Sequence, residues 1–261
     1  MKEQNLVGVI IPCYNYGVYL NEAVDSVLKS TYSPIEIIIV NDGSTDNTEE
    51  VVREIMTRND NVSYIYQNNQ GPSVARNNGI KRTKAKYILP LDADDKISDD
   101  YIEKAVDVLE NDTDVKIVYC NALFFGEKQG KWKLTKFSTK ELLVRNMIFS
   151  CALFRKEDWI KTGGYSHELL GGWEDWEFWI SMLKDGGCAF QLKITGFFYR
   201  IHPGSRDKST TKEIELHTEN FINHKHRDFI LSKIGRSFTV RRPKRLVRMT
   251  ASFLSIWASL F

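Results

Sequence analysis

The chain has 261 residues, of which 42% are hydrophobic, and this length allows one sizeable core with at most a small appendage. Its formal charge of +2 is unevenly placed: seven basic residues and no acidic one follow position 232, which leaves the rest at about −5 and excludes nucleic acid as the main partner. The four cysteines form no Cys-x-x-Cys pair, no run reaches transmembrane length and the N-terminus has no secretory signal, so we expect a cytoplasmic protein with reduced thiols.

Strand-like and helix-like segments alternate over the first half of the chain. Runs rich in β-branched residues predict strands at 7–11, 35–40, 62–66 and 86–91. Apolar residues at helical spacing predict helices at about 18–29 and at 71–81. Another helix is predicted to follow Asp46-Asn47-Thr48-Glu49, which has the spacing of a capping box. Strands buried on both faces and joined by helices indicate a parallel, doubly wound sheet, which binds ligands beyond the carboxyl ends of its strands.

The second half is less regular. Ser98 is the predicted N-cap of a helix that runs to about Glu110. Further strands are predicted at 115–119, 131–134, 190–192 and 196–201, and further helices at 139–146, 174–184 and 212–232. Within the 174–184 helix, the spacing of Trp176 and Trp179 predicts a buried face.

An acidic cluster, Leu91-Asp92-Ala93-Asp94-Asp95, ends the fourth predicted strand. If the backbone there is extended, Asp92 and Asp94 point the same way and repel each other unless a cation lies between them. Carboxylate oxygens are the ligands that Mg²⁺ and Mn²⁺ prefer. The alternative is an acidic turn that only caps the following helix.

Several motifs, in their order along the chain, resemble those of the family 2 inverting glycosyltransferases, and the match covers roughly residues 5–205. The motifs are Pro12-Cys13-Tyr14-Asn15, Asn41-Asp42-Gly43-Ser44, Asn69-Gln70-Gly71-Pro72 with Arg76, Asp92-Ala93-Asp94, Gly163-Gly164-Tyr165, Trp173-Glu174-Asp175-Trp176 and Tyr199-Arg200-Ile201-His202.

The resemblance implies a fold and a division of the chain. It implies an α/β protein with the glycosyltransferase-A fold: a single Rossmann-like domain with a mostly parallel central sheet and a C-terminal helical extension. The catalytic domain is expected at 1–210, with a nucleotide-binding half at about 1–95 and an acceptor half at about 96–210. Residues 211–261 form the expected C-terminal tail, which is helical, basic and apolar.

The resemblance also implies a donor site. Asp42 can accept a hydrogen bond only from a base with a ring N–H, which uracil and guanine have, and the family favours uracil. The alternative for Asp42 is to cap a tight turn, and the alternative for Arg76 is to pair with a neighbouring carboxylate. The full set of implied donor-binding residues is Pro12, Tyr14, Asn15, Asp42, Gly71, Arg76, Asp92 and Ala93.

The implied catalytic machinery needs a metal ion and one base. Asp94, with His202, is the implied ligand of Mn²⁺ or Mg²⁺, unless His202 is only a packed or surface residue. Asp175 is the implied general base, unless it and Glu174 only stabilise a helix N-terminus. Trp176 is equally well placed for the core. The implied acceptor-binding residues are Gly164, Trp173, Glu174 and Trp176.

The expected activity is metal-dependent, inverting transfer of one hexose or N-acetylhexosamine from a nucleotide sugar, with UDP favoured, to a saccharide or lipid-linked saccharide in polysaccharide biosynthesis. Processive members carry Gln-x-x-Arg-Trp after the base, which is absent here. The alternatives are a catalytically silent subunit of a glycan-assembly complex and a sugar-1-phosphate nucleotidyltransferase, which needs a Gly-rich loop after the first strand. The resemblance leaves a homo-oligomer open.

The end of the chain places basic residues from Arg241 to Arg248 before an apolar run that includes Trp257. A helix in the membrane interface fits this pattern, and would put the enzyme at the cytoplasmic face of a membrane as a peripheral protein. The alternative is that this segment packs on the catalytic domain or on another subunit.

Overall fold

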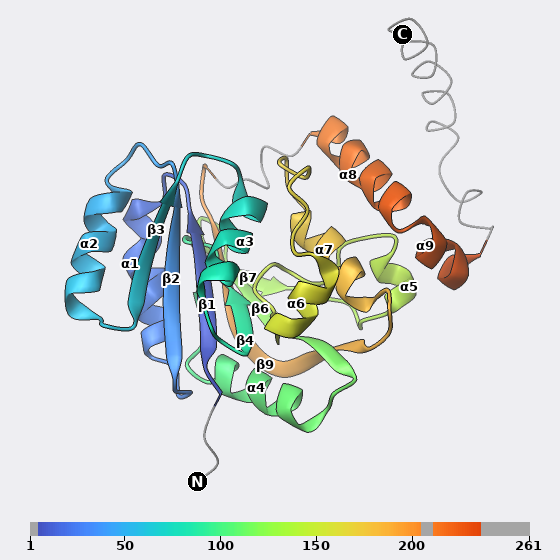
Figure 1. The fold of residues 1–261 in the computed structure, drawn as a ribbon, viewed down its shortest axis with the longest axis horizontal. Helices are drawn as coiled ribbons and strands as arrows, with labels where there is room; N and C mark the ends of the chain where they lie inside the picture. The colour runs from blue at the N-terminus through green and yellow to red at the C-terminus, as the bar shows by residue number, and fades with distance from the viewer. Residues whose placement is uncertain (1–4, 205–210, 236–261) are drawn as a thin grey trace, which may run out of the picture.

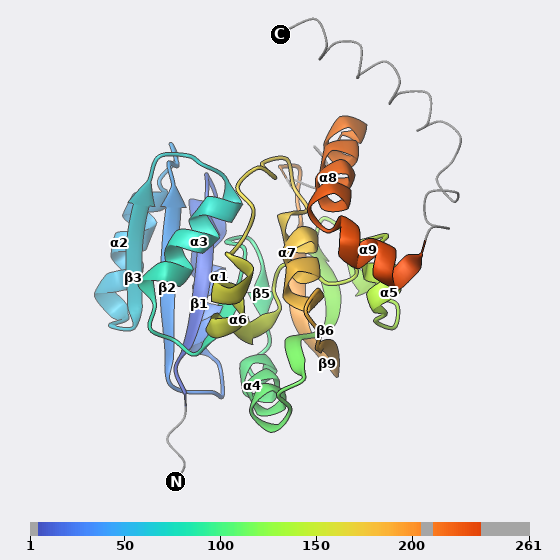
Figure 2. The same ribbon diagram turned by 45° about the vertical axis from the view of Figure 1, so that its right-hand side comes forward.

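The computed structural model describes residues 5–204 and 211–235, and its first half contains four parallel strands connected by helices (Figure 1). The strand order β3-β2-β1-β4 places β1 at the centre of this half. The strands are β1 (Val7–Cys13), β2 (Ile35–Asp42), β3 (Val62–Gln67) and β4 (Tyr87–Pro90), and the helices are α1 (Gly17–Leu28), α2 (Thr48–Arg58) and α3 (Pro72–Arg82). Figures 1 and 2 show α3 on one side of β1 to β3 and α1 and α2 on the other.

The apolar run of β1 explains its central place. Val9, Ile10 and Ile11 are 0% exposed, and burying such a side chain stabilises a fold by about 1.5–3 kcal/mol. Helix α3 packs directly on β1 and β2, and Gly79 allows this close approach because a Cβ atom there would lie 2.5 Å from Ile10. Because β1 is parallel to both β2 and β4, the carboxyl ends of these three strands meet at one edge of the sheet.

The second half of the sheet is mixed. The strand order continues β8-β6-β9-β5 beyond β4, with β8 antiparallel to both β4 and β6 and with β9 parallel to β6. These strands are β5 (Lys96–Ile97), β6 (Val115–Gly126), β8 (Leu153–Arg155) and β9 (Cys188–Ile201), and β7 (Gly130–Trp132) pairs with β6 off this path. The helices of this half are α4 (Tyr101–Asn111), α5 (Thr139–Leu142), α6 (Lys156–Thr162) and α7 (Glu174–Leu183). The predicted α/β fold with helices on a largely parallel sheet is confirmed.

Two C-terminal helices, α8 (Lys212–Lys225) and α9 (Arg227–Ile234), lie beside α7, on the side of the molecule opposite α1 and α2 (Figures 1 and 2). Ile222 and Ile230 are buried, and His226 Nε2 lies 2.6 Å from Glu177 Oε1 of α7. The predicted helix at 212–232 is therefore present as two helices. The tail from 236 onward, with its predicted membrane contact, lies outside the described residues. Within the described ranges, no helix is long and apolar enough to span a bilayer.

Some local predictions were wrong. The capping box fails because Glu49 pairs with Arg53, while Asp46 accepts a hydrogen bond from the Thr48 N–H. Ser98 is not the N-cap of α4: that position belongs to Asp100, to which the Ser98 hydroxyl donates a hydrogen bond. The segments 190–192 and 196–201 belong to one strand, β9, because register shifts in its pairing with β6 let the strand continue.

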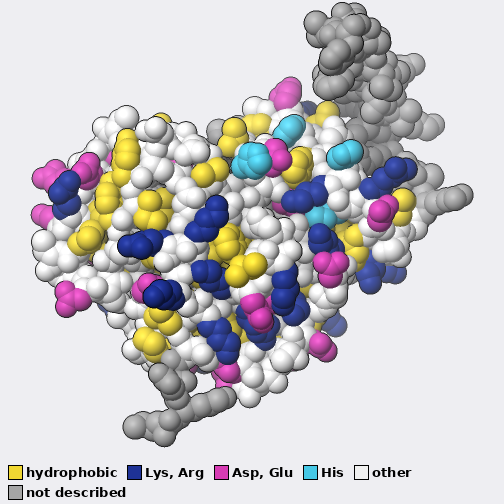
Figure 3. Space-filling view, in the orientation of Figure 1, with side chains coloured by type: hydrophobic (Ala, Val, Ile, Leu, Met, Phe, Trp, Pro, Cys, Tyr) yellow, Lys and Arg dark blue, Asp and Glu magenta, His cyan; other side chains and the backbone are white. Residues whose placement is uncertain are grey.

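The surface mixes charged and apolar side chains, and the cysteines are unpaired. Figure 3 shows hydrophobic side chains interspersed with charged ones of both signs, and histidines gathered over the region of α8. Cys13, Cys120 and Cys151 are buried and Cys188 is exposed, and all are free thiols.

Candidate active site

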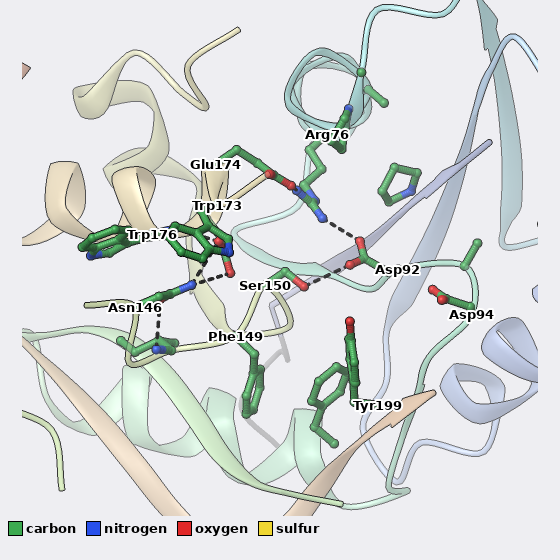
Figure 4. A pocket seen from close by; sticks show the side chains of 18 of the residues that line it. Arg76, Asp92, Asp94, Asn146, Phe149, Ser150, Trp173, Glu174, Trp176 and Tyr199 are labelled. Carbon is green, nitrogen blue, oxygen red and sulfur yellow. Dashed lines mark hydrogen bonds and ion pairs between the residues drawn. The ribbon is translucent and has the colours of Figure 1, made fainter. Parts of the chain in front are cut away.

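A cavity of about 920 Å³ lies at the carboxyl ends of β1, β2 and β4 (Figure 4). One end is lined by residues at or just beyond the carboxyl ends of these strands, including Pro12, Asp42 and Ala93. The other end is lined by the segment after β7 and by the loop 144–150. All but three of the predicted site residues line this cavity, and the three that do not are Asn15, Gly164 and His202.

Asp42 anchors the loop that precedes α3. Its Oδ1 accepts hydrogen bonds from Gln67 Nε2 at 2.7 Å and from the Gln70 N–H at 2.9 Å, and its Oδ2 accepts one from the Gly71 N–H at 2.8 Å. Gly71, at φ 85°, is the N-cap of α3. A carboxylate has about four acceptor positions, so Asp42 keeps about one for a ligand in the cavity.

Asn15 ties the end of β1 to the end of β2. It lies in the left-handed region at φ 58°, and its Oδ1 accepts a hydrogen bond from the Thr45 N–H at 2.7 Å. Asparagine is one of the few residues that adopt this conformation readily. Asn15 therefore holds this loop and does not line the cavity, while the neighbouring Tyr14 is 46% exposed and does line it.

Arg76 bridges two acidic motifs that are far apart in the sequence. Its Nη2 lies 2.6 Å from Asp92 Oδ1 and its Nη1 lies 2.6 Å from Glu174 Oε1 (Figure 4). Burial disfavours the charged guanidinium, but the two carboxylates outweigh burial and raise the pKa of Arg76. The ion-pairing alternative for Arg76 is thus realised, and Glu174 is engaged in the same bridge. The second oxygen of Asp92 accepts a hydrogen bond from Ser150 Oγ at 3.2 Å.

Asp94 faces His202 instead of sharing a point with Asp92. The Asp95 N–H donates to the Asp92 carbonyl at 3.0 Å, so the segment turns and the extended backbone that we expected is absent. His202 Nε2 lies 3.0 Å from Asp94 Oδ2, and the ring of Tyr16 packs edge-on against His202 at 5.3 Å. Burial and the nearby Asp92 raise the pKa of Asp94.

Asp94 and His202 could supply part of a coordination shell for a divalent cation. Among residues 5–204 and 211–235, no group of three or more His, Cys, Asp or Glu side chains is arranged to hold a metal by itself. Asp94 and His202 provide one carboxylate and one imidazole side by side. Mg²⁺ is usually bound by one or two carboxylates together with phosphate oxygens of the substrate and water. The pair fits a metal that a bound diphosphate helps to hold.

Asp175, in the first turn of α7, is half-buried and lines the cavity. Burial and the adjacent Glu174 raise its pKa to about 7, while Arg76 and Asn146 act in the other direction. Successive helical residues point about 100° apart, so Glu174 reaches Arg76 while Asp175 faces Asn146. A carboxyl group whose pKa is raised toward neutral pH is suited to accept a proton.

The predicted acceptor residues lie in different environments in the structure. Trp173 lines the cavity in the left-handed region at φ 62°, and its ring packs edge-on against Trp176 at 5.8 Å. Trp176 is 3% exposed and donates its Nε1–H to the Leu142 carbonyl, so it serves the core. Gly164 does not line the cavity, and a Cβ atom there would lie 2.6 Å from Asn77 Oδ1.

The sequence reasoning missed residues of the second half. Asn146 contacts Asp175 and Ser150 contacts Asp92, both from the loop 144–150. The predicted helix at 139–146 ends at Leu142, so Asn146 lies in this loop and not on a helix. A wall of aromatic rings also lines this end: Trp132 lies 5.9 Å from Phe149 and 5.2 Å from Tyr199, between ring centroids. The aromatic content of 128–137 and 197–199 was the available signal.

Comparisons with known proteins identify relatives. Residues 8–169 match the model of the family described as "Glycosyl transferase family 2". An uncharacterized glycosyltransferase of Rickettsia typhi is 31% identical over 221 residues, which are 80% of this chain and 68% of that protein. Glycosyltransferase GlyG of Streptococcus pneumoniae is 43% identical over 149 residues, which are 55% of this chain and 49% of that protein.

Solved structures share the fold. Residues 1–349 of Staphylococcus aureus TarS, in complex with UDP-GlcNAc, superpose with a TM-score of 0.68 at 16% identity, covering 93% of this chain and 77% of that chain. The mannosyltransferase PcManGT of Pyrobaculum calidifontis, in complex with GDP-Man and Mn²⁺, superposes with a TM-score of 0.65 at 16% identity, covering 99% of this chain and 82% of that chain. At these identities the likeness shows the fold alone.

Proposed function

The chain belongs to glycosyl transferase family 2 and is a glycosyltransferase, and from this premise we propose that it transfers one sugar from a nucleotide-sugar donor to a saccharide acceptor, with inversion and with Asp175 as the base. One observation carries the proposal: the half-buried carboxyl group of Asp175 lines the same cavity as Asp42, Asp92 and Asp94, and burial and Glu174 raise its pKa to about 7.

The chemistry follows from one displacement. The acceptor hydroxyl gives its proton to Asp175 as its oxygen attacks the anomeric carbon. The bond between that carbon and the nucleoside diphosphate breaks on the opposite face, and the diphosphate leaves with the electron pair. Since no covalent intermediate forms, one base is sufficient. Arg76 and Asn146 hold the base region in place, because Arg76 fixes Glu174 and Asn146 contacts both Asp175 oxygens.

Asp94 and His202 are the residues that would hold Mn²⁺ or Mg²⁺, and Asp92 lies beside them for the ribose. When bound, the ion neutralises negative charge on the departing diphosphate. The Mn²⁺ in the mannosyltransferase complex supports this assignment by analogy of fold.

The donor is a UDP-sugar in this proposal. The remaining acceptor position of Asp42 suits a ring N–H of uracil, and Pro12, Tyr14 and Gly71 line the same end of the cavity. UDP-GlcNAc in the TarS complex supports a uridine donor, whereas GDP-Man in the other complex shows that the fold also serves guanine. The transferred sugar is a hexose or an N-acetylhexosamine.

The acceptor is a glycan or a lipid-linked saccharide, and the enzyme works in polysaccharide biosynthesis at the cytoplasmic side of a membrane. Nonprocessive addition rests on the absence of Gln-x-x-Arg-Trp after Asp175. The membrane contact through residues 236–261 remains a proposal from the sequence.

The test is nucleotide release from a panel of UDP-glucose, UDP-galactose, UDP-GlcNAc and GDP-mannose with Mn²⁺, with and without simple glycoside acceptors. We expect one UDP-sugar to turn over, faster with an acceptor. Asp175→Asn keeps the shape but cannot accept the proton, so acceptor-dependent turnover should fall by about 10²- to 10⁴-fold while UDP binding persists.

The same assay separates the alternatives. A silent binding subunit would bind a nucleotide sugar and release no nucleotide from any member of the panel. A nucleotidyltransferase would instead form UDP-sugar from UTP and a sugar 1-phosphate; the segment after β1, Pro12 to Asn15, has no Gly-rich loop for that reaction. Near wild-type turnover of Asp175→Asn would contradict the assignment of the base.

A further inference from the structure

A basic segment lies along the acceptor end of the cavity. Between Glu127 and Arg145 the chain has six basic residues and two acidic ones, whereas the first 232 residues together carry about −5. We call residues 127–145 the basic segment; its cations are Lys128, Lys131, Lys133, Lys136, Lys140 and Arg145. Such a local reversal of charge on an otherwise acidic body attracts anions.

The topology of the sheet keeps this segment away from the donor end. On the path through the sheet, β1, β4 and β8 lie between β2, which carries Asp42, and β6, to which β7 is paired. Lys133 directly follows β7. Both Lys133 and Arg145 line the cavity. These two cations therefore border the part of the cavity where the acceptor, and not the nucleotide, is expected.

The two cations differ in their partners. Arg145 Nη2 donates to Thr135 Oγ1 at 2.8 Å and also pairs with Glu141, so its charge is partly compensated. Lys133 is exposed, and no described residue forms an ion pair or a hydrogen bond with its ammonium group. A lysine at a cavity wall carries its charge on a flexible side chain, so its ammonium group can contact an anion at a range of positions in the cavity.

An aromatic surface lies next to Lys133. Trp132, its neighbour in sequence, lines the cavity with Phe149 and Tyr199, and these rings are 5.2 to 5.9 Å from Trp132. Figure 4 shows Phe149 and Tyr199 on the side of the cavity that faces Ser150 and Asp92. Aromatic side chains offer a sugar a flat apolar surface of large area. The acceptor end thus combines a stacking surface with an uncompensated cation.

We propose that the acceptor is an anionic saccharide, with its sugar ring against Trp132 and Tyr199 and its phosphate or carboxylate group at Lys133. This inference rests on the proposed function, since it assigns the acceptor class of the same site. The carboxylates of the cavity would repel an acidic acceptor, and the basic segment offsets that repulsion where the acceptor enters.

The experiment measures binding by the full chain saturated with UDP and Mg²⁺, so that the donor end is filled. The probes are two matched pairs: glucose 6-phosphate against glucose, and methyl glucuronide against methyl glucoside. The variants are Lys133→Glu and, as the matched control, Lys131→Glu, which makes the same charge change at a lysine of β7 that does not line the cavity. UDP affinity is measured separately for each protein.

We expect the anionic member of at least one pair to bind about tenfold more tightly than the neutral member, the scale of one charge-assisted contact. Lys133→Glu should remove this preference and Lys131→Glu should keep it. The pair that responds shows whether the anion is a phosphate or a carboxylate.

Equal binding of anionic and neutral probes would overturn the inference, and so would an equal loss in both variants, which would indicate general attraction by the segment. A loss of UDP affinity in Lys133→Glu with an unchanged preference would make this lysine a ligand of the donor diphosphate. If the wild type bound no UDP, the proposed function itself would fail, so the two failures remain distinguishable.

Discussion

Asn146 donates its side-chain amide to both carboxylate oxygens of Asp175, at 3.2 Å from each. The two residues come from different elements, since Asn146 lies in the loop after α5 and Asp175 lies in the first turn of α7. Both line the cavity. A donor shared between the two oxygens fixes the plane of the carboxylate and favours its ionised form, which is the form that can accept a proton.

This contact predicts a change in the pH profile. Burial and Glu174 raise the pKa of Asp175 to about 7, and the amide of Asn146 opposes them. A base must be ionised to act, so wild-type turnover should rise with pH through about 7. Asn146→Ala removes the hydrogen bond that lowers the pKa of Asp175. The acidic limb of the pH profile of turnover should therefore move to higher pH by about one pH unit. The measurement is kcat against pH at saturating donor.

Asn111→Ala, at the exposed end of α4, is the control for this experiment. Its profile should coincide with that of the wild type. An Asn146→Ala enzyme with lower turnover but an unmoved acidic limb would show that Asn146 only supports the fold of the loop.

The sequence predicted the first half of the fold closely because strands β1 to β4 are buried runs with clear helical segments between them. It missed β8 (Leu153–Arg155) and α6 (Lys156–Thr162), since three and seven residues are too short to show a period. It also divided β9 in two, because the register shifts opposite Tyr119 and Asn121 accommodate a polar interruption that looks like a break.

The candidate site was predicted where motifs follow strands, and missed where contacts link distant segments. Asp42, Asp92 and Asp175 line the cavity as expected. The pairing of Arg76 with Glu174 joins residues 98 positions apart, and no local pattern encodes such a contact. For the same reason no local pattern predicted the contact of Asn146 or the aromatic wall, because these residues come together only when β6, β7 and β9 are assembled.

A second prediction concerns the metal. Asp94→Asn keeps the size of the side chain and removes the charge that would hold the ion beside His202, so transfer should fall by about 10²-fold or more. Wild-type activity should disappear with a chelator and return with Mn²⁺ or Mg²⁺. Asp99→Asn, at an exposed position before α4, is the matched control and should keep wild-type activity. Full turnover in the presence of the chelator would contradict a metal role for Asp94.

A third prediction concerns Arg76, whose side chain is 1% exposed between Asp92 and Glu174. Arg76→Met leaves a buried carboxylate at Glu174 without its cation, and removal of one partner from a buried ion pair costs about 3–5 kcal/mol. We expect that loss in the free energy of unfolding from chemical denaturation. Arg58→Met breaks an exposed pair with Glu54 and should change stability by less than about 1 kcal/mol.

A further variant, Arg76→Lys, decides between the two roles of Arg76. If its task is to hold Asp92 and Glu174 in place, UDP affinity of the folded Arg76→Lys enzyme should be close to that of the wild type. A large loss of UDP affinity with unchanged stability would instead make Arg76 a direct donor ligand.

The last prediction concerns Glu177, which joins α7 to the C-terminal helices. Its carboxylate is 0% exposed and lies 2.6 Å from His226 Nε2 and 3.0 Å from Lys225 Nζ. Burial alone would raise its pKa, but His226, Lys225, Ser166 and Ser181 outweigh burial and lower the pKa from 4.5 to about 2. Glu177→Gln should therefore reduce the free energy of unfolding at pH 7 by about 3 kcal/mol.

The pH dependence of that difference has a definite sign. A carboxyl group whose pKa is lowered by folding stabilises the fold above its unfolded pKa, here 4.5, and loses that contribution as the pH falls toward 2. The stability gap between wild type and Glu177→Gln should consequently be largest above pH 4.5 and should shrink below it. Denaturation curves at pH 7 and at about pH 3 measure the gap, with Glu215→Gln on the exposed face of α8 as the control. A gap that stays constant between the two pH values would mean that Glu177 contributes through packing and not through its charge.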